Sequence, residues 1–168
     1  MNFIYKGLIE QIRRNIPDLD VIVQHIFETW PKASKPLNKP DIYLDSVALN
    51  LHGFYSGVER LFEAIAKYID LNVPKGEFWH YELLLQVKQD IENIRPAVIT
   101  HNTAAMLDEF REFRHVARNV YTTKLDPERM TKMMSILHEL WQNLRAELFA
   151  FAEFLEELEA QDNINDLE

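Results

Sequence analysis

Apolar residues recur at steps of three and four along most of the chain, which is the spacing of an amphipathic helix. The pattern predicts helices over residues 18–30, 41–70, 79–94 and 103–123, and a last helix of about 30 residues from Pro127. In the 41–70 segment the apolar positions are Leu44, Val47, Leu51, Tyr55, Val58, Phe62, Ile65 and Ile69. Strand-like alternation bounded by turn residues is absent. The sequence therefore predicts an all-α protein.

Prolines and capping residues predict where these helices begin and end. Pro17 predicts the end of a short first helical segment, and Pro96 the end of the 79–94 segment. Asp126 fits an N-cap, and Pro127 fits the first position of the last helix. Short connections between long amphipathic helices favour antiparallel neighbours. We therefore expect an antiparallel up-and-down bundle of four to five helices.

Composition limits the class of protein. A chain of 168 residues predicts one domain, and we expect residues 1–160 to form it, with residues 161–168 as a frayed acidic tail. The chain contains no cysteine, which excludes a disulfide scaffold and fits a reducing compartment. No apolar run approaches the length of a membrane span, and the start lacks the apolar region of a signal peptide. We expect a cytoplasmic protein with no membrane partner.

Charge is unevenly distributed along the chain. The net charge of −9 argues against a general nucleic-acid-binding protein. Residues 147–168 hold eight acidic residues and no Lys or Arg, whereas residues 111–124 hold four basic residues and one acidic residue. A local basic face on an acidic protein indicates one site that binds an anion.

The basic segment can be placed on a helix. Its core-facing stripe consists of Met106, Phe110, Phe113, Ala117 and Val120. The polar side chains lie outside that stripe, with Arg114 and Tyr121 at one edge, Arg111 and Arg118 further round, and His115 and Asn119 near the outer face. Like charges one turn apart destabilise a helix by a few tenths of a kcal/mol each. Two interpretations remain open: acidic side chains of a neighbouring helix relieve this repulsion, or a bound anion does.

Three blocks of the sequence resemble one family. The signature of the HEPN superfamily, and specifically of HepT-like ribonuclease toxins, is an Arg, four residues, a His, one residue and a Tyr. Arg114 and Tyr121 match the two ends of this frame. The flanking Phe-Arg-His at 113–115, Leu-Asp-Pro-Glu-Arg-Met at 125–130 and Leu-Asn-Leu-His-Gly-Phe-Tyr-Ser-Gly-Val-Glu-Arg-Leu-Phe-Glu at 49–63 are also similar to a subgroup of that family. The likeness extends from about residue 40 to residue 155.

The resemblance implies a fold, an activity and partners. It implies a helical bundle that forms a homodimer, in which the signature helices of two protomers form the cleft of a metal-independent endoribonuclease without a cofactor. A histidine would activate the ribose 2′-OH, and arginines such as Arg114 would stabilise the charged phosphorane, with Arg111 and Arg118 binding RNA phosphates. It also implies a cognate antitoxin, a minimal nucleotidyltransferase that adenylylates the signature tyrosine, here Tyr121.

The chain departs from the signature at the histidine position, which Asn119 occupies. An amide cannot act as a general base, although it can form hydrogen bonds to a 2′-OH or a phosphate oxygen. Three outcomes stay open. The protein binds RNA or its partner without cutting RNA, His115 replaces the missing base, or Arg114 and Arg118 alone support slower catalysis.

The remaining polar residues carry less specific predictions. No His pair has metal-ligand spacing, so we expect no metal site. Glu59 and Glu63 form an i,i+4 pair that we interpret as salt-bridging on the helix surface or pairing with the basic helix. Glu59 is also a candidate partner that orients Arg114. Two functions follow: an endoribonuclease toxin of the HepT type, or a non-catalytic helical module that binds a nucleotidyltransferase or RNA.

Overall fold

The computed structural model describes residues 3–33, 41–118 and 125–165. Within these ranges the chain forms helices and no strand, so the prediction of an all-α protein is confirmed. In chain order the elements are α1 (Phe3–Thr29), the short 3₁₀ helix η1 (Trp30–Lys32), α2 (Ile42–Tyr68), α3 (Trp79–Val87), α4 (His101–Arg118) and α5 (Pro127–Asn165).

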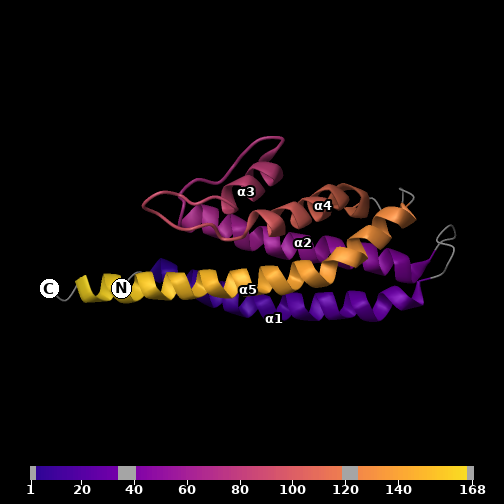
Figure 1. Cartoon of the computed structure of the whole chain (residues 1–168), viewed down its shortest axis with the longest axis horizontal. Coiled ribbons are helices and arrows are strands. Elements are labelled where there is room, and N and C mark those ends of the chain that lie inside the picture. The colour runs from indigo at the N-terminus through magenta and orange to yellow at the C-terminus, as the bar shows by residue number, and fades with distance from the viewer. Residues whose placement is uncertain (1–2, 34–40, 119–124, 166–168) are drawn as a thin grey trace.

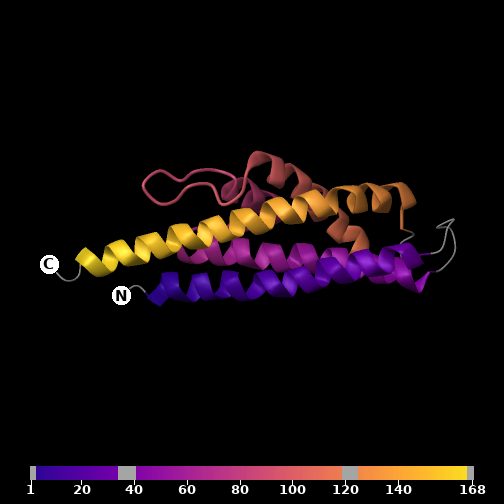
Figure 2. The same ribbon diagram turned by 60° about the horizontal axis from the view of Figure 1, so that its bottom comes forward.

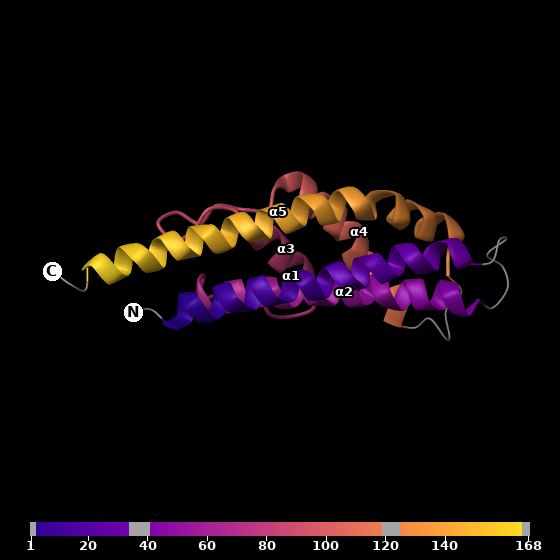
Figure 3. The ribbon, with the colours of Figure 1, turned by 90° about the horizontal axis from the view of Figure 1, so that it is seen from below.

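Four of the helices form an up-and-down bundle, as the sequence predicts. Helices α1, α2 and α5 run along the long axis of the molecule, and both chain ends lie at the same end of it (Figure 1, Figure 2 and Figure 3). Helix α2 packs against α1 and α4, and α5 packs against the same two helices. Helix α3 lies outside this bundle, against α2 and α4. None of the described helices combines the length and apolarity that a membrane span requires.

Helix α1 continues through Pro17, so the prediction that Pro17 ends a short first helix is wrong. Proline inside a helix removes a backbone hydrogen bond and costs about 3 kcal/mol. The apolar stripe nevertheless continues in phase on both sides of Pro17, and its residues are buried: Leu8, Ile12, Ile16, Leu19, Val23 and Ile26. Each such side chain contributes about 1.5–3 kcal/mol on burial. Packing against α2 and α5 therefore outweighs the local cost.

Helix α3 is shorter than the predicted 79–94 segment and ends at Val87. Residues 91–95 instead form a tight turn in which the Ile91 N–H donates to the Arg95 carbonyl oxygen at 2.8 Å. Asn93 takes a left-handed conformation with φ of 61°, which asparagine adopts more readily than most residues. The amide of Val98 then donates to the Val87 carbonyl oxygen at 2.8 Å and closes the loop.

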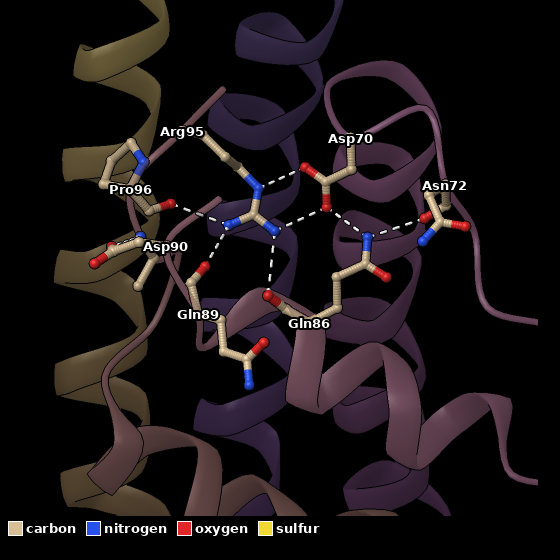
Figure 4. Close-up of polar contacts among 8 residues, drawn as sticks. Asp70, Asn72, Gln86, Gln89, Asp90, Arg95 and Pro96 are labelled. Carbon is tan, nitrogen blue, oxygen red and sulfur yellow. Dashed lines mark hydrogen bonds and ion pairs between the residues drawn. The ribbon is translucent and has the colours of Figure 1, made fainter. Parts of the chain in front are cut away.

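A buried ion pair fixes this loop to the end of α2. The Arg95 Nε and Nη2 groups donate to the two carboxylate oxygens of Asp70 at 2.6 and 2.8 Å. The same guanidinium donates to the carbonyl oxygens of Gln86, Gln89 and Pro96 (Figure 4). The Arg95 and Asp70 side chains are 0% and 1% exposed. The network determines where α3 lies against the bundle, because Gln86 belongs to α3.

The last helix begins as predicted. The Asp126 carboxylate accepts from the Glu128 N–H at 3.0 Å, which is the N-cap arrangement, and α5 starts at Pro127. Helix α5 spans 39 residues and continues to Asn165, into the segment that we expected to be frayed. Leu137, Leu144, Leu148 and Leu155 of this helix are fully buried in the core.

Candidate functional site

Helix α4 carries Arg114, the first residue of the signature frame, and core packing sets its position against α2. Phe54 of α2 packs edge-on against Phe110 of α4, with ring centroids 5.8 Å apart. The two helices are antiparallel (Figure 1), so residues that precede Phe54 lie level with residues that follow Phe110. At 1.5 Å per residue, His52 lies about level with the segment between Arg111 and Arg114.

Arg111 is neutralised by its own helix. Its Nε donates to Asp108 Oδ1 at 2.5 Å, and its Nη2 lies 3.7 Å from Glu112 Oε1. Burial lowers the pKa of the Arg111 guanidinium, but the hydrogen bond and the negative charge of Asp108 raise this pKa by more, so the net shift is upward. The guanidinium also lies over the Tyr81 ring of α3 at 5.3 Å. Arg111 therefore joins α4 to α3 and is already paired.

Arg114 and Arg118 are not paired in this way. The Arg114 Nε is buried and has no hydrogen-bond partner among the residues that the structure describes. Arg118 is exposed, and the described part of the chain gives it no ion pair. A buried guanidinium nitrogen without an acceptor is costly, because the group loses hydration and gains no partner. These two residues thus form a cationic surface that an external anion would neutralise.

An acidic group lies beside the arginines but is engaged elsewhere. Glu59 of α2 is 6% exposed, and its Oε2 accepts from His80 Nδ1 of α3 at 2.6 Å. Burial, and then the charge and hydrogen bond of Glu59, raise the pKa of the Tyr55 phenol. Glu59 therefore binds α3 through His80 and contacts Tyr55, and it does not orient Arg114 through a hydrogen bond.

His52 faces the unpaired arginines from α2. Its ring is partly exposed, and its Nδ1 lies 3.5 Å from the Ser56 Oγ one turn away. Burial, and then the charges of Arg114 and Arg118, lower the pKa of His52, while Glu59 acts in the opposite direction. These effects favour the neutral form of the imidazole. We call this candidate site the arginine seam. It consists of seven residues from α2, α3 and α4: His52, Tyr55, Glu59, His80, Arg111, Arg114 and Arg118.

The structure brings together part of the predicted site. Arg111, Arg114 and Arg118 share one face of α4, as expected. His115 belongs to α4, but its side chain lies outside the described parts of the structure, as do Asn119 and Tyr121. Their predicted roles remain predictions. Within the described segments, no group of three or more His, Asp or Glu residues is placed to hold a metal ion.

Sequence reasoning missed His52 and His80 as members of this group. The signal was present in the spacing, because His52, Ser56 and Glu59 follow one another at steps of four and three and so form one polar stripe on α2. Nothing in the sequence shows that this stripe faces the basic helix. That relation depends on α3, whose His80 contacts Glu59 of the stripe and whose Tyr81 contacts Arg111 of the basic helix.

The alternative that acidic residues of the last helix neutralise the basic helix is not what the structure shows. Contacts between α4 and α5 have the opposite polarity, because Lys132 of α5 contacts Glu109 at 2.7 Å and Arg129 lies 3.6 Å from Glu112. The basic residues of α5 thus bind the acidic residues of α4. Arg114 and Arg118 gain no acidic partner from α5 among the described residues.

Comparison with known proteins identifies the family. The model of a family described as HepT-like protein matches residues 46–155, which include most of α2, all of α3 and α4, and most of α5. Comparisons with curated proteins and with solved structures gave no match. The matched segment contains every residue of the arginine seam and covers well over half of the chain. The chain therefore belongs to the HepT-like family of the HEPN superfamily.

Proposed function

We propose that the protein is a metal-independent endoribonuclease that acts as the toxin of a toxin–antitoxin pair. The observation that carries this proposal is the pair of unneutralised cations on α4. Among the residues that the structure describes, the buried Arg114 Nε has no acceptor, and Arg118 one turn further along α4 is exposed. A phosphodiester supplies the missing acceptors, since arginine forms charge-assisted hydrogen bonds to phosphate oxygens. Membership of a family of HEPN-type ribonuclease toxins supports the same assignment.

The chemical role of Arg114 follows from charge. When the ribose 2′-oxygen attacks phosphorus, negative charge increases on the phosphorane oxygens. A guanidinium whose Nε is already buried can stabilise that charge with less reorganisation of solvent, and removing one such donor typically reduces a rate by about 10²–10³-fold. Arg118 is exposed and binds a neighbouring phosphate of the RNA chain.

Cleavage of a structured RNA by the purified protein tests this function. We expect the wild type to cut, and Arg114→Ala to cut at least about 100-fold more slowly. Arg13→Ala is the matched control. Arg13 lies on α1, and its ion pair with Glu156 joins side chains that are 50% and 43% exposed, so its loss changes stability little. Equal rates for the wild type and Arg114→Ala would refute the assignment.

The alternative is a non-catalytic module that binds a nucleotidyltransferase or RNA, and Asn119 at the signature histidine position favours it. Under this alternative the wild type binds RNA without cutting it, whereas Asn119→His gains cleavage. The observation that separates the two functions is therefore the activity of the wild-type protein in the same RNA assay.

The proposal includes a homodimer and a cognate antitoxin. Ile42 and Leu49 lie seven residues apart on α2, on one face of the helix, and are 77% and 39% exposed. A second copy of the chain would cover this face close to the arginine seam. The antitoxin would be a minimal nucleotidyltransferase that adenylylates Tyr121, and intact-mass measurement after incubation with that enzyme and ATP tests this modification against Tyr121→Phe.

A further inference from the structure

A histidine outside the signature segment lies in the arginine seam. His52 belongs to α2, three residues before Tyr55, and it comes level with Arg111–Arg114 because the Phe54–Phe110 contact sets the register of the two antiparallel helices. The other described elements that bear charge toward it are α4, through Arg114 and Arg118, and α2 itself, through Glu59. His52 shares its stripe on α2 with Glu59, which contacts His80 of α3, and the neighbouring Tyr81 of α3 contacts Arg111 of α4. This stripe of α2 therefore borders the basic face of α4 that carries Arg114 and Arg118.

We propose that His52 is a catalytic residue that accepts the proton of the ribose 2′-OH in RNA cleavage. This inference rests on the proposed ribonuclease function. It assigns the proton-accepting role, which Asn119 cannot perform, to a side chain on another helix. Arg114 and Arg118 would hold the phosphate next to the imidazole.

The state of the His52 ring suits this role. Its Nδ1 lies 3.5 Å from the Ser56 hydroxyl oxygen, a contact that either neutral tautomer can make, and the proposed role requires the tautomer whose Nδ1–H points toward Ser56. The lone pair of Nε2 is then free to accept a proton. Burial and the two arginines lower the pKa of His52, which favours the unprotonated ring. A general base must be unprotonated before the reaction.

The step balances as a transesterification. The 2′-oxygen forms a bond to phosphorus as its proton moves to His52 Nε2, and the bond from phosphorus to the 5′-oxygen of the next nucleotide breaks. The leaving 5′-oxygen takes a proton from water. The products are a 2′,3′-cyclic phosphate and a free 5′-hydroxyl, and His52 afterwards returns its proton to solvent. No oxidant, reductant or metal is consumed.

The test is the pH dependence of cleavage of a structured RNA by the full-length protein. Wild-type kcat/KM should rise tenfold per pH unit at acidic pH and level off at an apparent pKa below 6.5, the ordinary value for histidine. His52→Gln should lose about 10²–10⁴-fold in rate at neutral pH, and the remaining activity should lack that acidic limb. His101→Gln, at the exposed start of α4, should match the wild type in rate and pH profile.

A second measurement does not depend on turnover. The His52 ring can be titrated by NMR with and without an oligonucleotide whose 2′-oxygens are methylated, which binds but cannot be cut. Bound phosphate neutralises Arg114 and Arg118, so the His52 pKa should rise on binding. An unchanged titration with demonstrable binding would show that the phosphate lies elsewhere and would overturn the proposal.

The outcomes separate the two proposals. If the wild type cuts and Arg114→Ala does not, but His52→Gln retains the rate and the acidic limb, the ribonuclease function stands and the role of His52 is refuted. If His115→Gln abolishes the acidic limb and His52→Gln preserves it, the base is His115 and the proposal for His52 is likewise refuted. If the wild type does not cut, the ribonuclease function fails, and His52 has no proton to accept.

Discussion

Removing the Asp70 carboxylate should destabilise the whole domain, because it leaves a guanidinium buried without its counter-charge. Arg95 donates two charge-assisted hydrogen bonds to Asp70, and both side chains are almost fully excluded from solvent. In Asp70→Ala, only the backbone carbonyl oxygens of Gln86, Gln89 and Pro96 remain as acceptors. Breaking one partner of a buried ion pair typically costs about 3–5 kcal/mol.

That magnitude is large relative to the total stability of a domain, which is about 5–15 kcal/mol. With a urea m-value of about 2 kcal/mol/M, the unfolding midpoint of Asp70→Ala should fall by about 2 M. Urea unfolding followed by far-UV circular dichroism measures this shift directly. Hydrogen exchange should locate the first effect in α3, since Gln86 joins α3 to the same network.

Asp90→Ala is the matched control in the same loop. The Asp90 carboxylate is exposed and accepts one hydrogen bond from the Ala97 N–H at 2.7 Å, so its loss should cost about 1 kcal/mol. If Asp70→Ala proved no more destabilising than Asp90→Ala, the claim that the buried pair holds α3 against the bundle would be refuted.

Three further predictions concern stability. Gly53→Ala should raise the unfolding free energy by about 0.5–1 kcal/mol, because an added Cβ meets nothing within 4 Å. Gly57→Ala should give no such gain, because its Cβ would lie 2.8 Å from Leu19 Cδ2, and thermal unfolding of the two variants measures the difference. Burial raises the pKa of Tyr55, so the unfolding free energy should be constant below pH 10.0, the ordinary pKa of tyrosine, and should fall as pH rises above it. Tyr55→Phe should show a smaller fall when the unfolding free energy is measured as a function of pH. Glu147→Ala should cost about 2 kcal/mol and speed hydrogen exchange at the start of α4, since Glu147 Oε1 accepts three hydrogen bonds there.

Much of the fold could be predicted because helical periodicity is a local property. The bounds of α2 and the start of α5 at Pro127 follow from apolar spacing and a cap. The prediction at Pro17 was wrong because the destabilising effect of proline on a helix is local, whereas the burial that compensates for it depends on contacts with α2 and α5. The end of α3 at Val87 could not be predicted either, because it depends on the burial of Arg95 against Asp70, which is 25 residues away in sequence.

In the candidate site, too, local features could be predicted from the sequence and contacts between helices could not. The three arginines on one face of α4 follow from their spacing alone. Spacing could not show that Asp108 neutralises Arg111 while the Arg114 Nε has no acceptor in the described part of the chain, because all three arginines have acidic residues within a few turns. Likewise the sequence does not single out His52, because its position near the basic face of α4 depends on how α2 packs against α4.

The acidic character of the protein does not cancel the charge of the arginine seam, and the reason is distance. Two acidic residues of α5, Glu128 and Glu139, lie in its first half, and the others follow from Glu147 onward. Helix α5 contacts α4 near Arg129, which pairs with Glu112. At 1.5 Å per residue, Glu153 lies about 36 Å along α5 from Arg129. That separation exceeds the screening length of about 8 Å at physiological ionic strength several times over. The net charge of −9 thus reduces nonspecific attraction of nucleic acid to the body of the protein, while the acidic far half of α5 lies too far away to neutralise Arg114 and Arg118. Under the proposed function, an acidic protein with this arrangement would bind a phosphodiester at one place, next to the imidazole of His52, whose pKa burial and the two arginines lower.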